Sequence, residues 1–367
     1  MSGGALLYPA AGTGLLALVL YDVFTTILHH WGGAGPLSGR LAFRVWQGAV
    51  ALTRGIGPER RRRILGRVGP LLIPLTVTLW AGMVIVGFAL LYFPWAPGAF
   101  HTGRGVPALR TFADAVYYSG VTFFTVGFGD VVPVTPGLRL MAMVEGGSGF
   151  ALVTLVVGYF TSVYGVYSQQ KVAAASLYYQ AGSSPDAARV IRSYLHAGSA
   201  EGLAAEVGRL RDGLAAIRSG YASYPILHYF ASSRPEQSLV RLLFVVQDLG
   251  TLLDTAVDER GCPVAAGLGS RSGMRAAAAA VQDGVAGILL RGGTGDARGR
   301  GPLPESGEAW ARRFERARAE LRGAGVPVRE GGEALDEYRR RRGEWEPGLR
   351  AAAHALGEDW EEVAGGF

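Results

Sequence analysis

The sequence predicts an all-α membrane protein that continues into a helical region outside the membrane. Three apolar stretches, at about 9–28, 71–93 and 137–167, each reach the roughly 20 residues that a helix needs to cross about 30 Å of hydrocarbon. A shorter apolar run at 112–123 lies between the second and the third stretch. After Ser168 no alternating strand pattern appears, and we expect helices at about 170–181, 186–197, 200–219, 235–258, 272–291, 306–322 and 332–356.

The first apolar stretch contains an acid, Asp22, and ends at the pair His29-His30. A cleaved signal peptide is the alternative, but no basic residue precedes the apolar core and no small-residue cleavage site is evident, so we expect an uncleaved helix. An ionised acid facing lipid costs about 2.5–3.5 kcal/mol. We therefore expect Asp22 to face protein or water, paired with an arginine of the next segment or with a hydroxyl group; the alternative is a helix end close to water. The histidine pair marks a membrane–water boundary rather than a metal site.

The segment between the first two stretches sets the expected orientation. Eight arginines and one acid, Glu59, lie between Trp31 and Gly69. By the positive-inside rule this connection is cytoplasmic, so the amino terminus and the 94–111 loop lie outside and everything after Ser168 lies inside a bacterial plasma membrane. Residues 41–46 suggest an amphipathic helix on the inner leaflet, the alternative being a short solvated helix. The consecutive arginines at 60–63 belong to a loop and lack the regular spacing of a voltage sensor.

The short run at 112–123 begins with a helix-start signal. Thr111 is a suitable N-cap, and Asp114 falls in the first turn. About three turns are too few to span a bilayer, so this helix is expected to be re-entrant, entering from outside and stopping midway. Its carboxyl end then directs a partial negative charge into the membrane, where a cation is stabilised.

The hexapeptide that follows, TVGFGD, has the composition of a cation-coordinating backbone. Successive carbonyl oxygens point the same way when alternate residues are left-handed, which glycine adopts without a Cβ penalty. Gly127 and Gly129 occupy such alternate positions. The carbonyls of Thr125, Val126, Gly127 and Phe128, with the Thr125 hydroxyl, would replace the water shell of a dehydrated cation. A glycine-rich turn at a helix end is the alternative, which the flanking apolar stretches disfavour.

These residues resemble the potassium-channel family, in a bacterial branch with a two-helix pore and one extra amino-terminal helix. The resemblance implies a selectivity filter at 125–129, K⁺ sites at Thr125, Val126, Gly127 and Phe128, and support from Tyr118 and Asp130. It also implies a gating hinge at Gly149. Two departures stand out: Phe128 replaces the commoner tyrosine, and Val121 stands where some bacterial members have a glutamate behind the filter.

Glu145 lies about two turns into the third stretch. A carboxylate at that depth needs hydrogen bonds or a proton. We expect it to support the filter by bracing the re-entrant helix from behind, in a site that lacks a carboxylate at Val121; the alternative is a water-filled crevice.

The predicted function is passive K⁺ conduction by a homotetramer in membrane lipid, with no enzymatic activity and no cofactor besides the permeant ion. A pore subunit of a potassium transporter is one alternative, although such chains carry four degenerate pore loops and this chain has one intact loop. A membrane-anchored sensor with a vestigial pore is the other. The net charge of +6 does not indicate nucleic-acid binding, because most arginines after Ser168 are mixed with acids.

The predicted domains are an amino-terminal transmembrane helix (1–30), the arginine-rich connection (31–69), the pore domain (70–168), a helical cytoplasmic domain (169–291), a flexible linker (292–304) and a carboxy-terminal helical segment (305–367). The glycine-rich linker lacks the strand and the Gly-Lys-Ser/Thr ending of a phosphate-binding loop. The aromatic cluster at 221–230 is expected to be an interhelical packing loop, the alternative being a site for an unidentified cytoplasmic ligand. Cys262, the only cysteine, is expected to be a packing residue.

Overall fold

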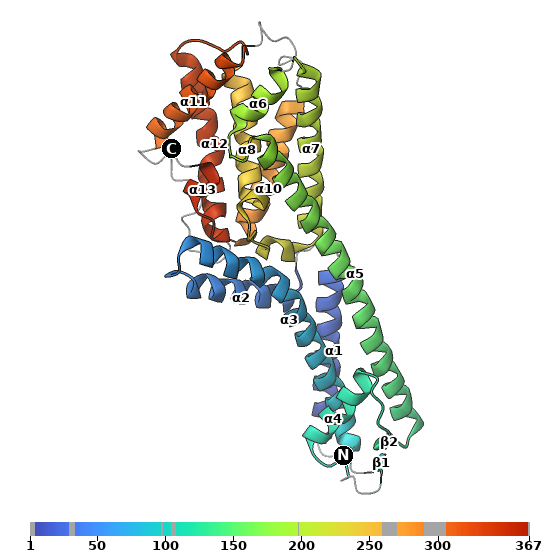
Figure 1. The fold of residues 1–367 in the computed structure, drawn as a ribbon. Helices are drawn as coiled ribbons and strands as arrows, with labels where there is room; N and C mark the ends of the chain where they lie inside the picture. Colours follow the sequence, from blue (N-terminus) through green and yellow to red (C-terminus); the bar gives the residue numbers. More distant parts are fainter. Residues whose placement is uncertain are drawn as a thin grey trace. The chain divides into compact units, whose positions relative to one another are not determined.

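The computed structural model describes residues 4–28, 34–96, 98–103, 108–196, 198–258, 270–289 and 306–365, which are mostly helical (Figure 1). They divide by packing into two units. The membrane unit comprises the described residues within 1–42 and 71–163, and the helical unit comprises those within 43–70 and 164–367. The His29-His30 pair, Cys262 and the predicted linker at 292–304 lie outside the described residues.

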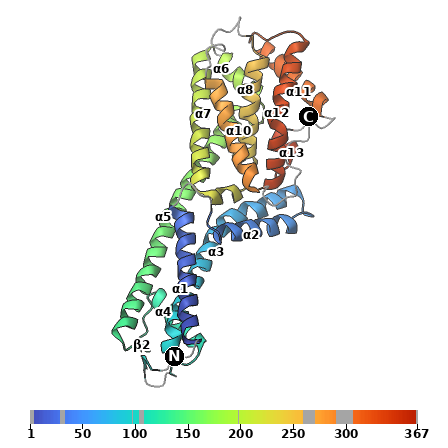
Figure 2. The same ribbon diagram turned by 180° about the vertical axis from the view of Figure 1, so that it is seen from behind.

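The three predicted spanning helices are present. Helix α1 (Gly4–Val23) continues as one π-helical turn (Phe24–Leu28), α3 runs over Pro58–Tyr92, and α5 runs over Pro136–Gln180. The segments Leu6–Leu28, Pro58–Trp95 and Pro136–Gln180 are each long and apolar enough to cross a membrane. The short helix α4 (Phe112–Phe123) lies between α3 and α5 in the sequence, as expected (Figures 1 and 2).

Two helix boundaries differ from the sequence prediction. The arginines at 60–63 belong to α3 and not to a loop, because α3 begins at Pro58, a residue favoured at the first helical position. The helix expected at 170–181 is not separate, since α5 continues without interruption to Gln180. No proline separates the apolar part of α5 from its polar continuation.

A two-stranded antiparallel sheet, which the sequence did not predict, flanks the TVGFGD segment. Strand β1 (Phe100–Thr102) pairs with β2 (Val131–Pro133), with His101 opposite Val132. Strands of three residues are too short to produce a recognisable alternating pattern. The pairing connects the segment after α3 to the chain that follows the hexapeptide.

Helices α1 and α3 approach closely at a pair of glycines. A Cβ atom added to Gly12 would lie 2.7 Å from the carbonyl oxygen of Gly87, and one added to Gly87 would lie 2.8 Å from the Leu16 side chain. Small residues at such crossings let helix backbones pack directly against each other in membranes. This contact fixes the first helix against the second.

Asp22 is fully buried, so the prediction that it faces protein is confirmed. Its partners differ from those expected. The indole Nε1 of Trp80 donates to Oδ2 at 2.7 Å, and the backbone amide of Leu37 donates to Oδ1 at 2.7 Å. The amide of Ser38, the first residue of α2 (Ser38–Leu52), also donates to the carboxylate. The amides at a helix start have no helical acceptor, so the carboxylate satisfies them in place of the expected arginine or hydroxyl.

The helices after α5 agree with the sequence pattern, with one short addition. The aromatic cluster at 221–230 comprises the end of α7 and the 3₁₀ turn Pro225–Tyr229, in which Leu227, His228 and Tyr229 are buried, as an interhelical packing loop requires. The remaining helices are α6 (Ala187–Leu195), α7 (Ala200–Ser223), α8 (Leu239–Thr255), α10 (Ser270–Leu289), α11 (Ser306–Gly323), α12 (Gly332–Leu356) and the unpredicted α13 (Trp360–Ala364).

Buried ion pairs join these helices. Asp248 on α8 accepts hydrogen bonds from Arg313 Nε at 2.9 Å, Arg342 Nη1 at 2.8 Å and the Tyr338 hydroxyl at 2.8 Å. Burial alone would raise the pKa of Asp248, but the two guanidinium groups outweigh it and hold the pKa below its ordinary value. The carboxylate therefore stays ionised and links α8 to α11 and α12.

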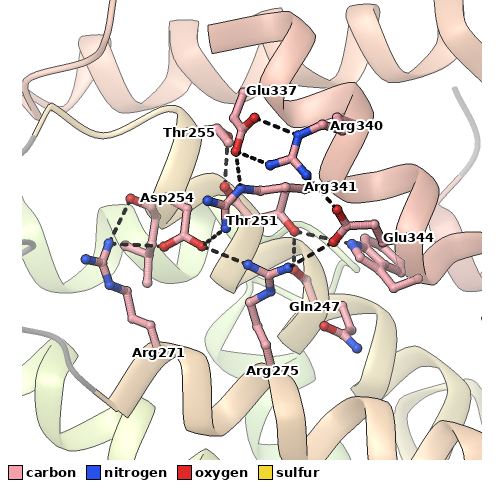
Figure 3. A network of polar contacts seen from close by, with 12 residues as sticks. Gln247, Thr251, Asp254, Thr255, Arg271, Arg275, Glu337, Arg340, Arg341 and Glu344 are labelled. Atoms are coloured by element: carbon pink, nitrogen blue, oxygen red, sulfur yellow. Dashed lines mark hydrogen bonds and ion pairs between the residues drawn. The ribbon is translucent and has the colours of Figure 1, made fainter.

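A second network surrounds Asp254, at the carboxyl end of α8 (Figure 3). Three guanidinium groups from two other helices converge on this carboxylate: Arg271 at 3.3 Å, Arg275 at 2.8 Å, and Arg341. These contacts join α8 to α10 and α12.

The glycine contact between α1 and α3 gives a matched pair of variants. Gly12→Ala should destabilise the protein by about 1–3 kcal/mol, because the new Cβ meets backbone that cannot move aside. Gly14→Ala, on the same helix with open space around it, should be neutral or slightly stabilising. Thermal unfolding in detergent measures both, and equal midpoints for the two variants would contradict the close approach.

Candidate functional site

Helix α4 begins with a reciprocal cap. The Thr111 hydroxyl accepts from the Asp114 amide at 3.2 Å, and the Asp114 carboxylate accepts from the Thr111 amide at 2.8 Å. The predicted helix start is therefore confirmed. At the other end, the amide of Val126 donates to the carbonyl of Val121 at 2.9 Å, which fixes the point where the chain leaves the helix.

In the segment after α4, the backbone dihedral φ alternates between positive and negative values. Gly127 and Gly129 have φ values of +62° and +74°, as the sequence pattern predicted. Thr125 also has a left-handed φ of +54°, which was not predicted because the Cβ of threonine opposes it. Left-handed residues thus stand at every second position, and the carbonyl groups between them can align along one side of the strand.

The residues of this segment are exposed within the single chain. The side chains of Val126 and Phe128 are 51% and 68% exposed. The oxygen atoms offered here are neutral carbonyls and one hydroxyl, which suit a hard monovalent cation that must also be released. Among the described residues no group of three or more His, Cys, Asp or Glu side chains could hold a metal ion.

Tyr117 and Tyr118 have different contacts. The Tyr117 hydroxyl donates to Asp130 Oδ2 at 2.8 Å, so this tyrosine connects α4 to the residue after the glycines. Tyr118, which the sequence analysis named, is buried on another side of α4, with its ring centroid 5.0 Å from those of Tyr92 and Phe100. Adjacent residues on a helix point about 100° apart, and sequence alone could not say which one faces Asp130.

Glu145 is buried behind α4 and contacts two helices. The Tyr92 hydroxyl donates to Oε2 at 2.8 Å, and the Ser119 hydroxyl donates to Oε1. Ser119 Oγ also lies 2.8 Å from the carbonyl oxygen of Ile85. The carboxylate of α5 thereby joins α3 and α4. The bond from Ser119 of α4 to Glu145 is of the kind expected from the sequence. The bond from Tyr92 was not expected, because Tyr92 lies 53 positions from Glu145 and no local sequence signal connects the two.

Gly149 lies where α5 crosses the end of α4. A Cβ atom added to Gly149 would collide with the carbonyl oxygen of Phe123, and one added to Gly146 would lie 3.5 Å from that of Thr122. Close packing therefore requires glycine at 149. Helix α5 runs continuously through this position.

Comparisons with known proteins show similarity to an ion-channel family over the residues of this site. Residues 75–165 match a family model described as an ion channel. The chain is 25% identical over 256 residues to an uncharacterized membrane protein of Bacillus subtilis, YdjJ, covering 70% of this chain and 72% of that protein. It is 32% identical over 84 residues to protein LctB of Geobacillus stearothermophilus, covering 21% of this chain and 62%, less than two thirds, of that relative. No solved structure matches.

The bonds of Glu145 should be measurable as stability. Glu145→Leu leaves the hydroxyls of Tyr92 and Ser119 without their carboxylate acceptor in a buried place, at a cost of about 1–3 kcal/mol. Glu145→Gln keeps one acceptor oxygen and should cost less. Thermal unfolding in detergent ranks the variants, and a Glu145→Leu protein as stable as wild type would show that these bonds contribute nothing.

Proposed function

Residues 75–165 form an ion-channel pore domain, and from that premise we propose that the chain is one subunit of a potassium-selective channel. It is a channel rather than an enzyme. The observation that best supports potassium selectivity is the left-handed φ at every second residue, namely Thr125, Gly127 and Gly129. The carbonyls of residues 125–128 then coordinate a K⁺ ion stripped of water, and weak binding to neutral oxygens allows the ion to move on.

The exposure of Val126 and Phe128 within the single chain supports assembly of identical subunits around this segment. One strand of carbonyls cannot surround an ion, and a ring of four copies closes the coordination shell. Helix α5 also leaves large apolar side chains uncovered, among them Leu140, Met143, Val144, Phe150, Val153 and Val157. In the tetramer the filter faces the axis, and parts of α5 face neighbouring subunits or lipid.

The filter is held from two sides in this proposal. Asp130, bonded to Tyr117, anchors the outer end of the filter, and Glu145 braces α4 from behind. Tyr118 supports the filter indirectly, through its aromatic packing with Tyr92. Gly149 serves as the gating hinge of α5 in addition to allowing close packing.

The arginine-rich connection supports an orientation with the amino terminus outside and the helical unit in the cytoplasm. Helix α2 then lies at the inner membrane surface. Arg40 and Arg44 lie one turn apart on α2, and both are exposed, which suits contact with anionic headgroups.

Ion flux into liposomes tests the channel function. Wild-type protein should pass K⁺ far better than Na⁺. Gly127→Ala should lower K⁺ flux by about tenfold or remove discrimination, because a Cβ opposes the left-handed backbone by about 1–2 kcal/mol. Gly120→Ala on α4 is the matched control: both glycines have open space around them within the chain, and φ is positive only at Gly127. Equal passage of both ions by wild type would contradict selectivity.

Cysteine labelling tests the orientation. In a Cys262→Ser background, single cysteines replace His101 and Gln47, which are both exposed. Ser38 in the same connection is unsuitable because it is buried. An impermeant thiol reagent applied outside intact cells should label position 101 and leave position 47 unlabelled. The reverse pattern would overturn the orientation.

A further inference from the structure

The first turns of α3 are packed against the end of the chain within the helical unit. Arg62 is 7% exposed and forms an ion pair with Glu362 on α13. Leu65, one turn further along α3, is fully buried. The start of a spanning helix is thus held by the carboxy-terminal segment, residues 356–365.

Three glycines allow close packing around these turns. Gly357 ends α12 with a φ of +73°, and a Cβ there would collide with Leu65. A Cβ on Gly66 would collide with Ser233, and one on Gly69 would lie 2.7 Å from the carbonyl oxygen of Tyr229. Residues 61–69 of α3 therefore fit closely against two other segments and cannot shift without moving them.

A second arginine reinforces the contact from α8. Arg241 donates to the backbone carbonyl of Glu362, and both Arg241 and Arg62 interact electrostatically with Glu358. Ser238, the N-cap of α8, donates to the Glu358 carboxylate. The carboxy-terminal segment is thereby bonded to α3 and to α8 together, so a displacement of α8 acts on α3 through it.

Helix α3 changes character just after this contact. Pro70 and Pro74 lie within it, and proline has no N–H for the carbonyl four residues earlier. Such positions are where helices bend. The division between the two units also falls after Pro70. Beyond the prolines α3 reaches Tyr92, which bonds Glu145 behind the filter.

We propose that the carboxy-terminal segment is a gating latch. It holds α3 at Arg62. Rearrangement of the helical unit moves the first turns of α3 relative to the rest of the helix, with Pro70 and Pro74 as the point of bending, and changes the opening of the pore. The control of the pore thus passes through the outer helix α3, in addition to any movement of α5. The latch rests on the proposed channel function.

A double-mutant cycle on open probability tests the latch. Arg62→Ala and Glu362→Ala should each change single-channel open probability in planar bilayers at least about fivefold. The double variant should change it no further than the larger single effect, because both remove one contact. The permeability ratio of K⁺ to Na⁺ should stay at the wild-type value. Arg63→Ala is the matched control. The Arg63 side chain is next to Arg62 in the sequence but is 61% exposed, and its guanidinium group lies 4.0 Å from the carboxylate of Glu59 on the same helix.

Additive effects in the cycle, or wild-type open probability in both single variants, would overturn the latch. Should a variant fold poorly, a bifunctional cross-link gives a second test: Arg62→Cys with Glu362→Cys, in a Cys262→Ser background, treated with a bis-methanethiosulfonate whose short spacer makes up for the length of the two side chains removed. The reagent should join the pair, and open probability should change and return on reduction. Failure of the reagent to join the pair contradicts the contact, and a cross-link without a change in gating contradicts the coupling.

Failure of the latch proposal can be distinguished from failure of the proposed channel function. Selectivity and conduction are read first from wild-type protein, whereas the latch is read from differences between variants that all conduct. A wild type that conducts no ions contradicts the channel function, and the latch with it.

Discussion

Non-helical backbone at membrane depth must be held and satisfied by the protein around it, because lipid offers no hydrogen bonds. In the proposed channel the TVGFGD segment is such a backbone, and the pore domain is organised around it. Its entry is fixed by the bond from Val126 to Val121, and its exit by the bonds that Asp130 receives from Tyr117 and from the amide of Gly103. Without these restraints, the left-handed φ of Thr125 would relax to a commoner conformation.

The two buried carboxylates of the membrane unit follow the same rule. Asp22 and Glu145 each lie in an apolar helix, and each accepts hydrogen bonds from two other elements. Asp22 joins α1 to α3 and to the start of α2, whereas Glu145 joins α5 to α3 and α4. Apolar packing alone permits many helix arrangements in lipid, and these directional bonds select one.

Local signals predicted much of this structure. The spanning helices follow from apolar length, the start of α4 from the spacing of Thr111 and Asp114, and the left-handed φ values of Gly127 and Gly129 from glycine itself. Each depends on residues a few positions apart, which is the range over which sequence patterns carry information.

Features that depend on distant contacts could not be predicted in the same way. The bond between Tyr92 and Glu145 spans 53 positions, and that between Asp22 and Trp80 spans 58. The choice of Tyr117 over Tyr118 as the partner of Asp130 depends on the rotation of α4 within the fold. The arginines at 60–63 were predicted to lie in a loop because four consecutive charges favour solvent. Arg62 is nevertheless buried, and its charge is paired with Glu362. In each case a polar group finds a partner that only the folded chain brings near.

In the proposed channel, carbonyl groups of several identical chains form one ion path. Electron cryomicroscopy of the protein in lipid nanodiscs with K⁺ tests it most directly. We expect four chains around one axis, with the carbonyls of residues 125–128 facing a row of axial density. A monomer, or a symmetric assembly in which these carbonyls point away from the axis, would contradict it.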